Sequence, residues 1–127
     1  MQNGRAGMPR LLIVDDDPTM VSLLKTLLEL DGFEVTPTTN PDQALESIRQ
    51  VKPDLVIMDV FLSSRDGLEL LRQVRASAEL GHTPVIMTSG MDVSDRAREA
   101  GADGFMLKPY SPPDLIAMIR QRLDASG

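Results

Sequence analysis

Short apolar runs alternate along the chain with longer segments in which apolar residues recur every three or four positions. The runs lie near residues 10–14, 33–38, 55–58, 85–87 and 104–107. Runs of this length are typical of buried parallel strands, and the spacing between them is typical of amphipathic helices. Strand and helix in regular succession predict right-handed crossovers, and therefore one α/β domain with a doubly wound parallel sheet and helices on both faces.

Capping and breaking residues mark where these elements begin and end. Asp17 and Pro18 form an N-cap and first-turn pair that starts the first helix, and Gly32 ends it. We therefore assign Asp17 to the helix cap and not to a metal. Pro37 lacks an N–H, which predicts that strand 33–38 lies at a sheet edge. The inward stripe expected of the first helix is Met20, Leu23, Leu24, Leu27 and Leu28.

Composition narrows the class of protein. The 127 residues are enough for one domain with a core, and 42% hydrophobic with 25% charged residues is typical of globular proteins. The net charge of −6 and the lack of a basic stripe argue against direct nucleic-acid binding. No cysteine is present, which excludes thiol-bound metals. No apolar stretch approaches the roughly 18 residues of a membrane span, so we expect a cytoplasmic protein.

Acidic residues directly follow two of the apolar runs. Asp15 and Asp16 follow the first run, and Asp59 follows the third. Ligands of open parallel sheets bind at the carboxyl ends of the strands, so these carboxylates converge if the two strands are neighbours. Clustered carboxylates repel each other unless a cation lies among them, and oxygen ligands of this kind suit Mg²⁺. The pattern predicts Mg²⁺-assisted phosphoryl transfer.

Five short motifs in order resemble the receiver domain of bacterial two-component response regulators, in particular stand-alone, chemotaxis-regulator-like receivers. They lie at residues 14–18, 53–59, 66–67, 84–90 and 101–110 (VDDDP, PDLVIMD, DG, PVIMTSG and GADGFMLKPY). The resemblance implies a flavodoxin-like (βα)5 fold with a five-stranded parallel sheet in the order 2-1-3-4-5. It also implies a flexible tail over residues 1–8, a receiver domain over residues 9–124 and no output domain.

The resemblance assigns roles around the acidic residues. Asp59 matches the phosphoacceptor. Asp16 matches the direct ligand of Mg²⁺ or Mn²⁺, Asp15 the ligand that acts through water, and Asp59 and the backbone carbonyl of Phe61 complete the protein ligands. Lys108 matches the lysine that meets the phosphoryl oxygens, and its bond to the following proline is cis in the family.

Two further positions match the family's switch residues. Ser89 lies five residues after Pro84 and matches the switch hydroxyl. Because side chains alternate along a strand, we expect Ser89 to face the pocket and Thr88 to face away. Phe105 matches the aromatic switch position, although a permanently buried Phe is an alternative.

The chain departs from the family pattern in the loop after Asp59. Ser63 stands where many members have proline. The resemblance therefore does not determine the backbone geometry of loop 61–65, including the position of the Phe61 carbonyl. Phe61 and Met91 occupy positions that tune hydrolysis of the phosphoryl group in the family. Both are apolar here, which predicts slow dephosphorylation.

The resemblance implies a signalling domain that is not an enzyme acting on external substrates. It would accept a phosphoryl group from a histidine kinase or histidine phosphotransfer protein and dock on a downstream target protein. We expect a monomer that could dimerise when phosphorylated. A pseudo-receiver that docks without phosphorylation and a phosphorelay intermediate remain alternatives. A haloacid-dehalogenase-type phosphatase would need a second Asp where Phe61 stands.

Overall fold

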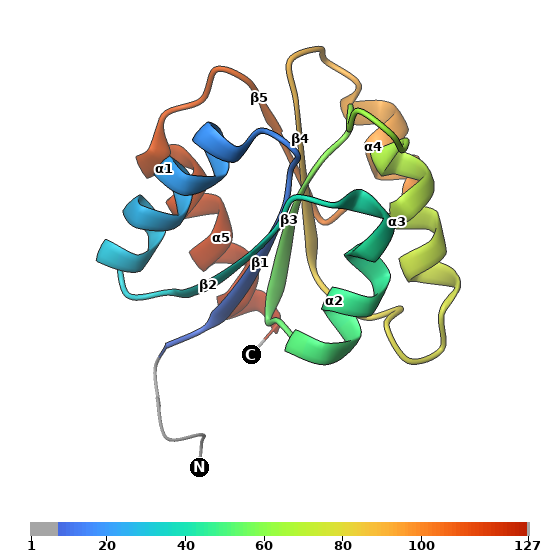
Figure 1. The fold of residues 1–127 in the computed structure, drawn as a ribbon, viewed down its shortest axis with the longest axis horizontal. Helices are drawn as coiled ribbons and strands as arrows, with labels where there is room; N and C mark the ends of the chain where they lie inside the picture. Colours follow the sequence, from blue (N-terminus) through green and yellow to red (C-terminus); the bar gives the residue numbers. More distant parts are fainter. Residues whose placement is uncertain (1–7, 127) are drawn as a thin grey trace.

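A computed structural model of the protein describes residues 8–126, so most of the expected tail at residues 1–8 lies outside the described part. Strands and helices alternate along the chain (Figure 1). The strands are β1 (Arg10–Val14), β2 (Glu34–Thr38), β3 (Leu55–Asp59), β4 (Val85–Ser89) and β5 (Gly104–Leu107). The helices are α1 (Pro18–Leu30), α2 (Ala44–Val51), α3 (Gly67–Ala76), α4 (Ser94–Ala100) and α5 (Pro112–Ser126), with a 3-10 turn at Pro41–Gln43.

The strands form one parallel sheet in the order β2-β1-β3-β4-β5, which confirms the expected fold. Strand β2, which carries Pro37, lies at one edge of this sheet as predicted. An edge strand pairs on one side only, so the missing N–H of proline can face away from the sheet without loss of a backbone hydrogen bond. Strands β1 and β3 are neighbours, with Val14 level with Met58. The carboxyl ends that carry the acidic residues therefore lie side by side.

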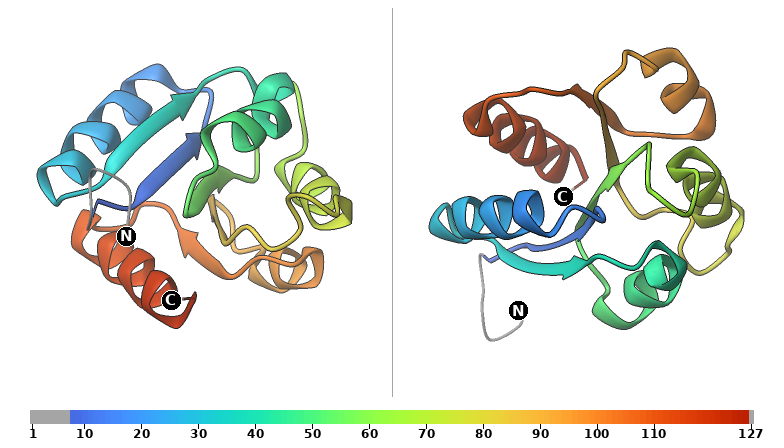
Figure 2. Two further views of the ribbon diagram at one scale, coloured as in Figure 1. Left: turned by 90° about the horizontal axis from the view of Figure 1, so that it is seen from below. Right: turned by 45° about the horizontal axis from the view of Figure 1, so that its top comes forward.

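Helices cover both faces of the sheet. Figures 1 and 2 show α1 and α5 on one face and α2, α3 and α4 on the other. Strand β3 alternates between two buried clusters, because Leu55 and Ile57 pack on the α1 and α5 side whereas Val56 and Met58 pack on the opposite side. A strand that is apolar on both faces is what a central position in a helix-covered parallel sheet requires.

Two strands extend further into polar residues than their apolar runs predicted. Strand β3 includes Asp59, and β4 continues through Thr88 and Ser89. The reason lies in the ladder, because the Thr88 carbonyl accepts a hydrogen bond from the Val60 amide and the Ser89 carbonyl accepts one from the Lys108 amide. Backbone hydrogen bonds to the neighbouring segments therefore keep these polar residues in strand conformation.

The buried face of α1 differs from the predicted stripe. Val21, Leu24 and Leu28 are buried, whereas Leu23 is 56% exposed. Positions 21, 24 and 28 follow the spacing of one helix face, and that face lies on the sheet. Leu23 lies on a second apolar stripe that the sheet does not cover. Among residues 8–126, no helix has the length and apolarity needed to span a membrane.

Candidate functional site

Two carboxylates and one ammonium group meet at the carboxyl edge of the sheet. Asp15 directly follows β1, Asp59 ends β3, and Lys108 directly follows β5. The Lys108 Nζ lies 3.5 Å from Asp15 Oδ2 and 3.5 Å from Asp59 Oδ2. The peptide bond between Lys108 and Pro109 is cis, as the resemblance implied. Residues from three strands thus form one ionic cluster.

Asp59 is a largely buried acidic group at the end of β3. Its side chain is 12% exposed, and burial raises the pKa of its carboxyl above the ordinary value. Lys108 acts in the opposite direction because its positive charge favours the carboxylate, while the neighbouring Asp15 raises the pKa further. A carboxylate whose charge is only partly compensated by the protein favours an additional cation or a reaction that modifies it.

The Asp16 side chain makes its hydrogen bond with the loop that follows β3. Its carboxylate accepts a hydrogen bond from the Ser63 amide, and hydrogen bonds from Ser63 lower the pKa of Asp16. The sequence predicted that all three carboxylates converge. The structure joins Asp15 and Asp59 at Lys108, and the Asp16 carboxylate is hydrogen-bonded to loop 61–65. Within residues 8–126, no group of three His, Cys, Asp or Glu side chains is placed to hold a metal ion.

The donor atoms are nevertheless suited to magnesium. Mg²⁺ is bound by one or two carboxylates and keeps several water molecules, so it does not require three carboxylates in direct contact. Asp15, Asp16 and Asp59 offer only oxygen donors at one edge of the sheet. Phe61, whose carbonyl was expected to add a ligand, is 52% exposed and forms an isolated backbone bridge with Asp66.

Asp17 serves as the cap of α1, as predicted. Its Oδ1 accepts hydrogen bonds from the Thr19 amide at 3.1 Å and the Met20 amide at 3.2 Å. The Asp17 amide donates in turn to Asp15 Oδ1 at 3.1 Å. The cap therefore also orients a carboxylate of the ionic cluster, a role that the sequence pattern did not indicate.

The two adjacent hydroxyl groups of β4 are both buried but occupy different positions. Thr88 lies level with Asp59 in the strand register, and Ser89 lies one residue further toward the carboxyl edge. The Ser89 Oγ accepts a hydrogen bond from the Met91 amide at 3.0 Å, so this hydroxyl anchors the loop that follows β4.

Phe105 is half-buried in β5 and packs against the cluster on the side of α2, α3 and α4. A cavity of about 360 Å³ lies beside it, between α4 and β5. The ring thus has free volume next to it.

The sequence motifs included Gly67 without explaining its role, and the structure supplies a steric reason. A Cβ atom on Gly67 would lie 2.1 Å from the Asp59 backbone oxygen. The Gly67 amide also donates to the Val60 carbonyl at 2.8 Å. The start of α3 therefore packs directly on the backbone of Asp59, which no other residue type would allow without displacement.

The structure is a doubly wound α/β domain with an acidic cluster and one lysine at the carboxyl edge of its parallel sheet. Residues 11–120 match the family described as the response regulator receiver domain. The chain belongs to this family.

Curated relatives support the assignment over most of the chain. The DNA-binding response regulator MtrA of Mycolicibacterium smegmatis is 36% identical over 116 residues, which cover 90% of this chain and 50% of MtrA. The transcriptional regulatory protein TrcR of Mycobacterium tuberculosis is 37% identical over 121 residues, which cover 93% of this chain and 46% of TrcR. The chain thus spans about half the length of these relatives.

Solved structures agree with the fold. A CheY-like response regulator receiver domain protein from Methanospirillum hungatei has a TM-score of 0.85 at 31% identity and is covered over 96% of its chain, with 94% of this chain covered. The BeF3-activated N-terminal receiver domain of Klebsiella pneumoniae RstA has a TM-score of 0.82 at 30% identity, with 97% of that chain and 90% of this one covered.

Proposed function

We propose that Asp59 accepts a phosphoryl group from the phosphohistidine of a histidine kinase or a histidine phosphotransfer protein, and that the modified domain docks on a downstream target protein. The observation that carries this proposal is the position of Lys108, whose Nζ lies 3.5 Å from both Asp15 and Asp59. An ammonium group at this position can form an ion pair with the oxygens of a phosphoryl group bound to Asp59.

The chemistry follows from charge. An Asp59 oxygen forms a bond to phosphorus while the bond from phosphorus to the histidine nitrogen breaks, and the group transferred is itself negative. Asp15 and Asp59 carry two negative charges against the single positive charge of Lys108. Mg²⁺ or Mn²⁺, held by Asp16, Asp59 and the Phe61 carbonyl with Asp15 acting through water, would supply the missing positive charge. Preorganised charge is the main catalytic tool in phosphoryl transfer.

The proposed output uses two residues beyond the acidic cluster. Ser89, whose Oγ accepts a hydrogen bond from the Met91 amide, would donate its hydroxyl hydrogen to a phosphoryl oxygen. The retained bond to Met91 would then draw the loop after β4 inward. Phe105 would then move into the adjacent cavity between α4 and β5. A local change in charge would thereby alter the surface formed by α4, β5 and α5.

The proposed phosphoryl group is long-lived. Phe61 and Met91 are 52% and 63% exposed, and neither side chain offers a donor or a strong acceptor to position a water molecule for attack on phosphorus. The domain would thus catalyse only its own phosphorylation and a slow loss of the group. A phosphoryl lifetime of only seconds in Mg²⁺ would contradict this part of the proposal.

The decisive experiment treats the protein with acetyl phosphate, with and without Mg²⁺, and records the intact mass. We expect the wild type to gain one phosphoryl group in the presence of Mg²⁺ and Asp59→Asn to gain none. Beryllium fluoride should change the spectrum of the wild type but not that of the variant. A wild type that stays unmodified under these conditions would instead be a docking module that works without phosphorylation.

A further inference from the structure

Thr88 is a buried polar residue that the proposed phosphoryl transfer does not use. It is 2% exposed and lies level with Asp59 in the register between β4 and β3. The Ser89 hydroxyl accepts a hydrogen bond from the Met91 amide, whereas the Thr88 hydroxyl is hydrogen-bonded to no other residue of the described range 8–126. Buried hydroxyl groups in native proteins are almost always paired, so an unpaired one beside a reactive carboxylate calls for a functional reason.

The packing of the two strands places Thr88 on the same side of the sheet as Asp59. Ile57 and Ile86 are the level pair two residues earlier, and both pack on the side of α1 and α5. Side chains of a strand return to the same face every two residues, and adjacent strands lie only about 4.8 Å apart. The side chains of Asp59 and Thr88 are therefore neighbours on that face.

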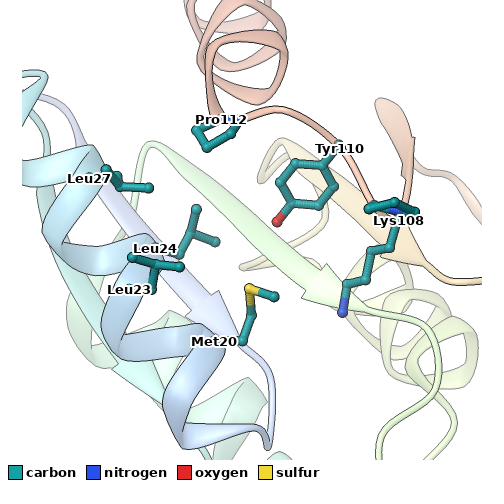
Figure 3. Close-up of a pocket in the computed structure, with 8 residues that line it drawn as sticks. Met20, Leu23, Leu24, Leu27, Lys108, Tyr110 and Pro112 are labelled. Atoms are coloured by element: carbon teal, nitrogen blue, oxygen red, sulfur yellow. The ribbon is translucent and has the colours of Figure 1, made fainter.

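Lys108 encloses this pair of side chains. Its amide donates to the Ser89 carbonyl at the end of β4, and its Nζ lies 3.5 Å from Asp59 Oδ2 on β3. Because β4 lies between β3 and β5, the Lys108 side chain passes over β4 to reach the carboxylate. Figure 3 shows this side chain extending from the segment after β5 toward the carboxyl end of β3. The Thr88 hydroxyl thus lies in a region bounded by Asp59 and Lys108.

We propose that Thr88 is a positioning residue whose hydroxyl donates a hydrogen bond to the Asp59 carboxylate as the phosphodonor binds. The proposal rests on the proposed function of Asp59, and it gives Thr88 a role in the pocket that the sequence had not led us to expect. A carboxylate accepts up to about four hydrogen bonds, so the contact of Lys108 with Oδ2 leaves capacity for the hydroxyl. The additional donor restricts rotation of the carboxylate and keeps one oxygen directed at phosphorus. The hydroxyl retains its proton.

Only side-chain rotation is needed to form this bond. The Thr88 carbonyl accepts a hydrogen bond from the Val60 amide at 2.8 Å, so the backbone is fixed on both sides of the pair. Catalytic hydrogen bonds are often unformed or long before the substrate binds and tighten in the complex. The unpaired hydroxyl in the free protein is therefore the state from which the bond forms.

Two substitutions separate the hydroxyl of Thr88 from its methyl group. Thr88→Val removes the hydroxyl at nearly constant shape, whereas Thr88→Ser keeps the hydroxyl and removes the methyl group. Modification by acetyl phosphate in excess Mg²⁺, followed by intact mass, gives a rate constant per unit donor concentration. We expect this constant to fall about ten-fold in Thr88→Val, because hydrogen bonds to charged groups are strong, and to stay within about two-fold of the wild type in Thr88→Ser.

Thr38→Val is the matched control for the loss of a buried hydroxyl. Thr38 is 8% exposed and ends β2 at the same edge of the sheet, but β1 separates it from β3. The rate constant of Thr38→Val should equal that of the wild type. A ten-fold loss in this variant as well would overturn the specific role of Thr88.

Urea denaturation distinguishes positioning from a structural role. Thr88→Val should be at least as stable as the wild type, because it removes an unpaired buried hydroxyl, and Thr88→Ser should be less stable, because it deletes a buried methyl group. The rate constant would thus follow the hydroxyl while stability follows the methyl group. A rate constant that fell in Thr88→Ser and not in Thr88→Val would overturn the inference.

A second donor and a metal titration complete the test. Phosphoramidate has a different leaving group, so a hydroxyl that acts through Asp59 should give the same ten-fold loss with this donor. A loss with only one donor would assign Thr88 to that donor and overturn the inference. Tyr110 is the only tyrosine and the chain has no tryptophan, so Tyr110 fluorescence can follow Mg²⁺ binding, which should be equal in the wild type and Thr88→Val.

The outcomes also separate this inference from the proposed function. Equal rate constants for the wild type and Thr88→Val would overturn the role of Thr88 and leave the proposed function of Asp59 standing. Weaker Mg²⁺ binding in Thr88→Val that accounts for the whole loss of rate would likewise overturn it. A wild type that neither donor modifies would overturn both.

Discussion

The Ser63 amide donates a hydrogen bond to the carboxylate of Asp16, 47 residues earlier in the chain. Ser63 is also the residue that stands where many receiver domains have proline. A proline has no N–H and could not make this bond. The departure from the family pattern therefore creates a contact that holds a proposed metal ligand against loop 61–65.

We predict that Ser63→Pro strengthens Mg²⁺ binding several-fold. The substitution removes the N–H that competes for the Asp16 carboxylate. A hydrogen bond to a charged group contributes about 1.5–3 kcal/mol net of water, and only part of this opposes the metal because a carboxylate has several lone-pair sites. Ser63→Ala keeps the amide and is the control, in which a smaller change is expected. Isothermal titration calorimetry with Mg²⁺ measures both variants. Unchanged or weaker binding in a folded Ser63→Pro protein would show that the Asp16 contact does not compete with the metal.

We predict that Asp59→Asn stabilises the metal-free protein at neutral pH by roughly 1 kcal/mol, the usual scale of single substitutions. Burial raises the pKa of Asp59 in the folded protein, so the charged carboxylate destabilises the fold relative to the unfolded chain. This destabilisation is fully present above the folded pKa and disappears as the pH falls through it toward the ordinary value of 3.8. The gain in unfolding free energy of Asp59→Asn should therefore shrink over the same pH range.

Urea denaturation at neutral pH and at about pH 4, close to the ordinary pKa of Asp, tests this dependence. Asp124→Asn, at an exposed position of α5, is the control and should change the free energy of unfolding little at either pH. An advantage of Asp59→Asn that grew toward acidic pH would contradict the assigned direction of the pKa shift.

We predict that Gly67→Ala destabilises the fold by about 1–3 kcal/mol, the usual cost of overpacking. The new Cβ would lie 2.1 Å from the Asp59 oxygen and 2.9 Å from the Val60 Cα, and both of these are backbone atoms that cannot rotate away. Gly90→Ala is the matched control, because a Cβ there has no neighbour within 4 Å. Chemical denaturation compares the two variants. Equal stability would show that α3 can shift away from the Asp59 backbone at little cost.

We predict that Arg75→Ala destabilises the domain by about 2–3 kcal/mol, because it leaves hydrogen-bond acceptors unpaired. Arg75 donates to the Gly101 carbonyl at 2.9 Å, to the Thr83 carbonyl at 2.6 Å and to the Asp103 carboxylate at 2.8 Å. It thereby links the end of α3 to the start of β4 and to the turn after α4.

Arg72→Ala provides the comparison for Arg75 on the same helix. Arg72 is about half exposed, and its 3.5 Å contact with Glu69 is a surface ion pair of the kind that contributes at most about 1 kcal/mol. Thermal or urea denaturation of both variants should show a clearly larger loss for Arg75→Ala. Similar losses would indicate that the Arg75 contacts are replaced by water.

The sequence by itself determined the architecture and the principal acidic residues of the site. Strand and helix order follows from apolar periodicity, which is a local property of the chain. Asp17 was identifiable as a cap and Pro37 as an edge-strand residue because both depend on the backbone chemistry of single positions. The adjacency of Asp15 and Asp59 followed from strand ends that meet at one edge of a parallel sheet.

Only the tertiary structure decided which groups are in contact within the site. The bond between Asp16 and Ser63, and the contacts of Arg75, join segments that no periodicity relates. The exposure of Leu23 depended on which of two apolar stripes on α1 faces the sheet, because both stripes have helical spacing. Side-chain direction and the packing of distant segments set these contacts, and they are fixed only when the layers come together.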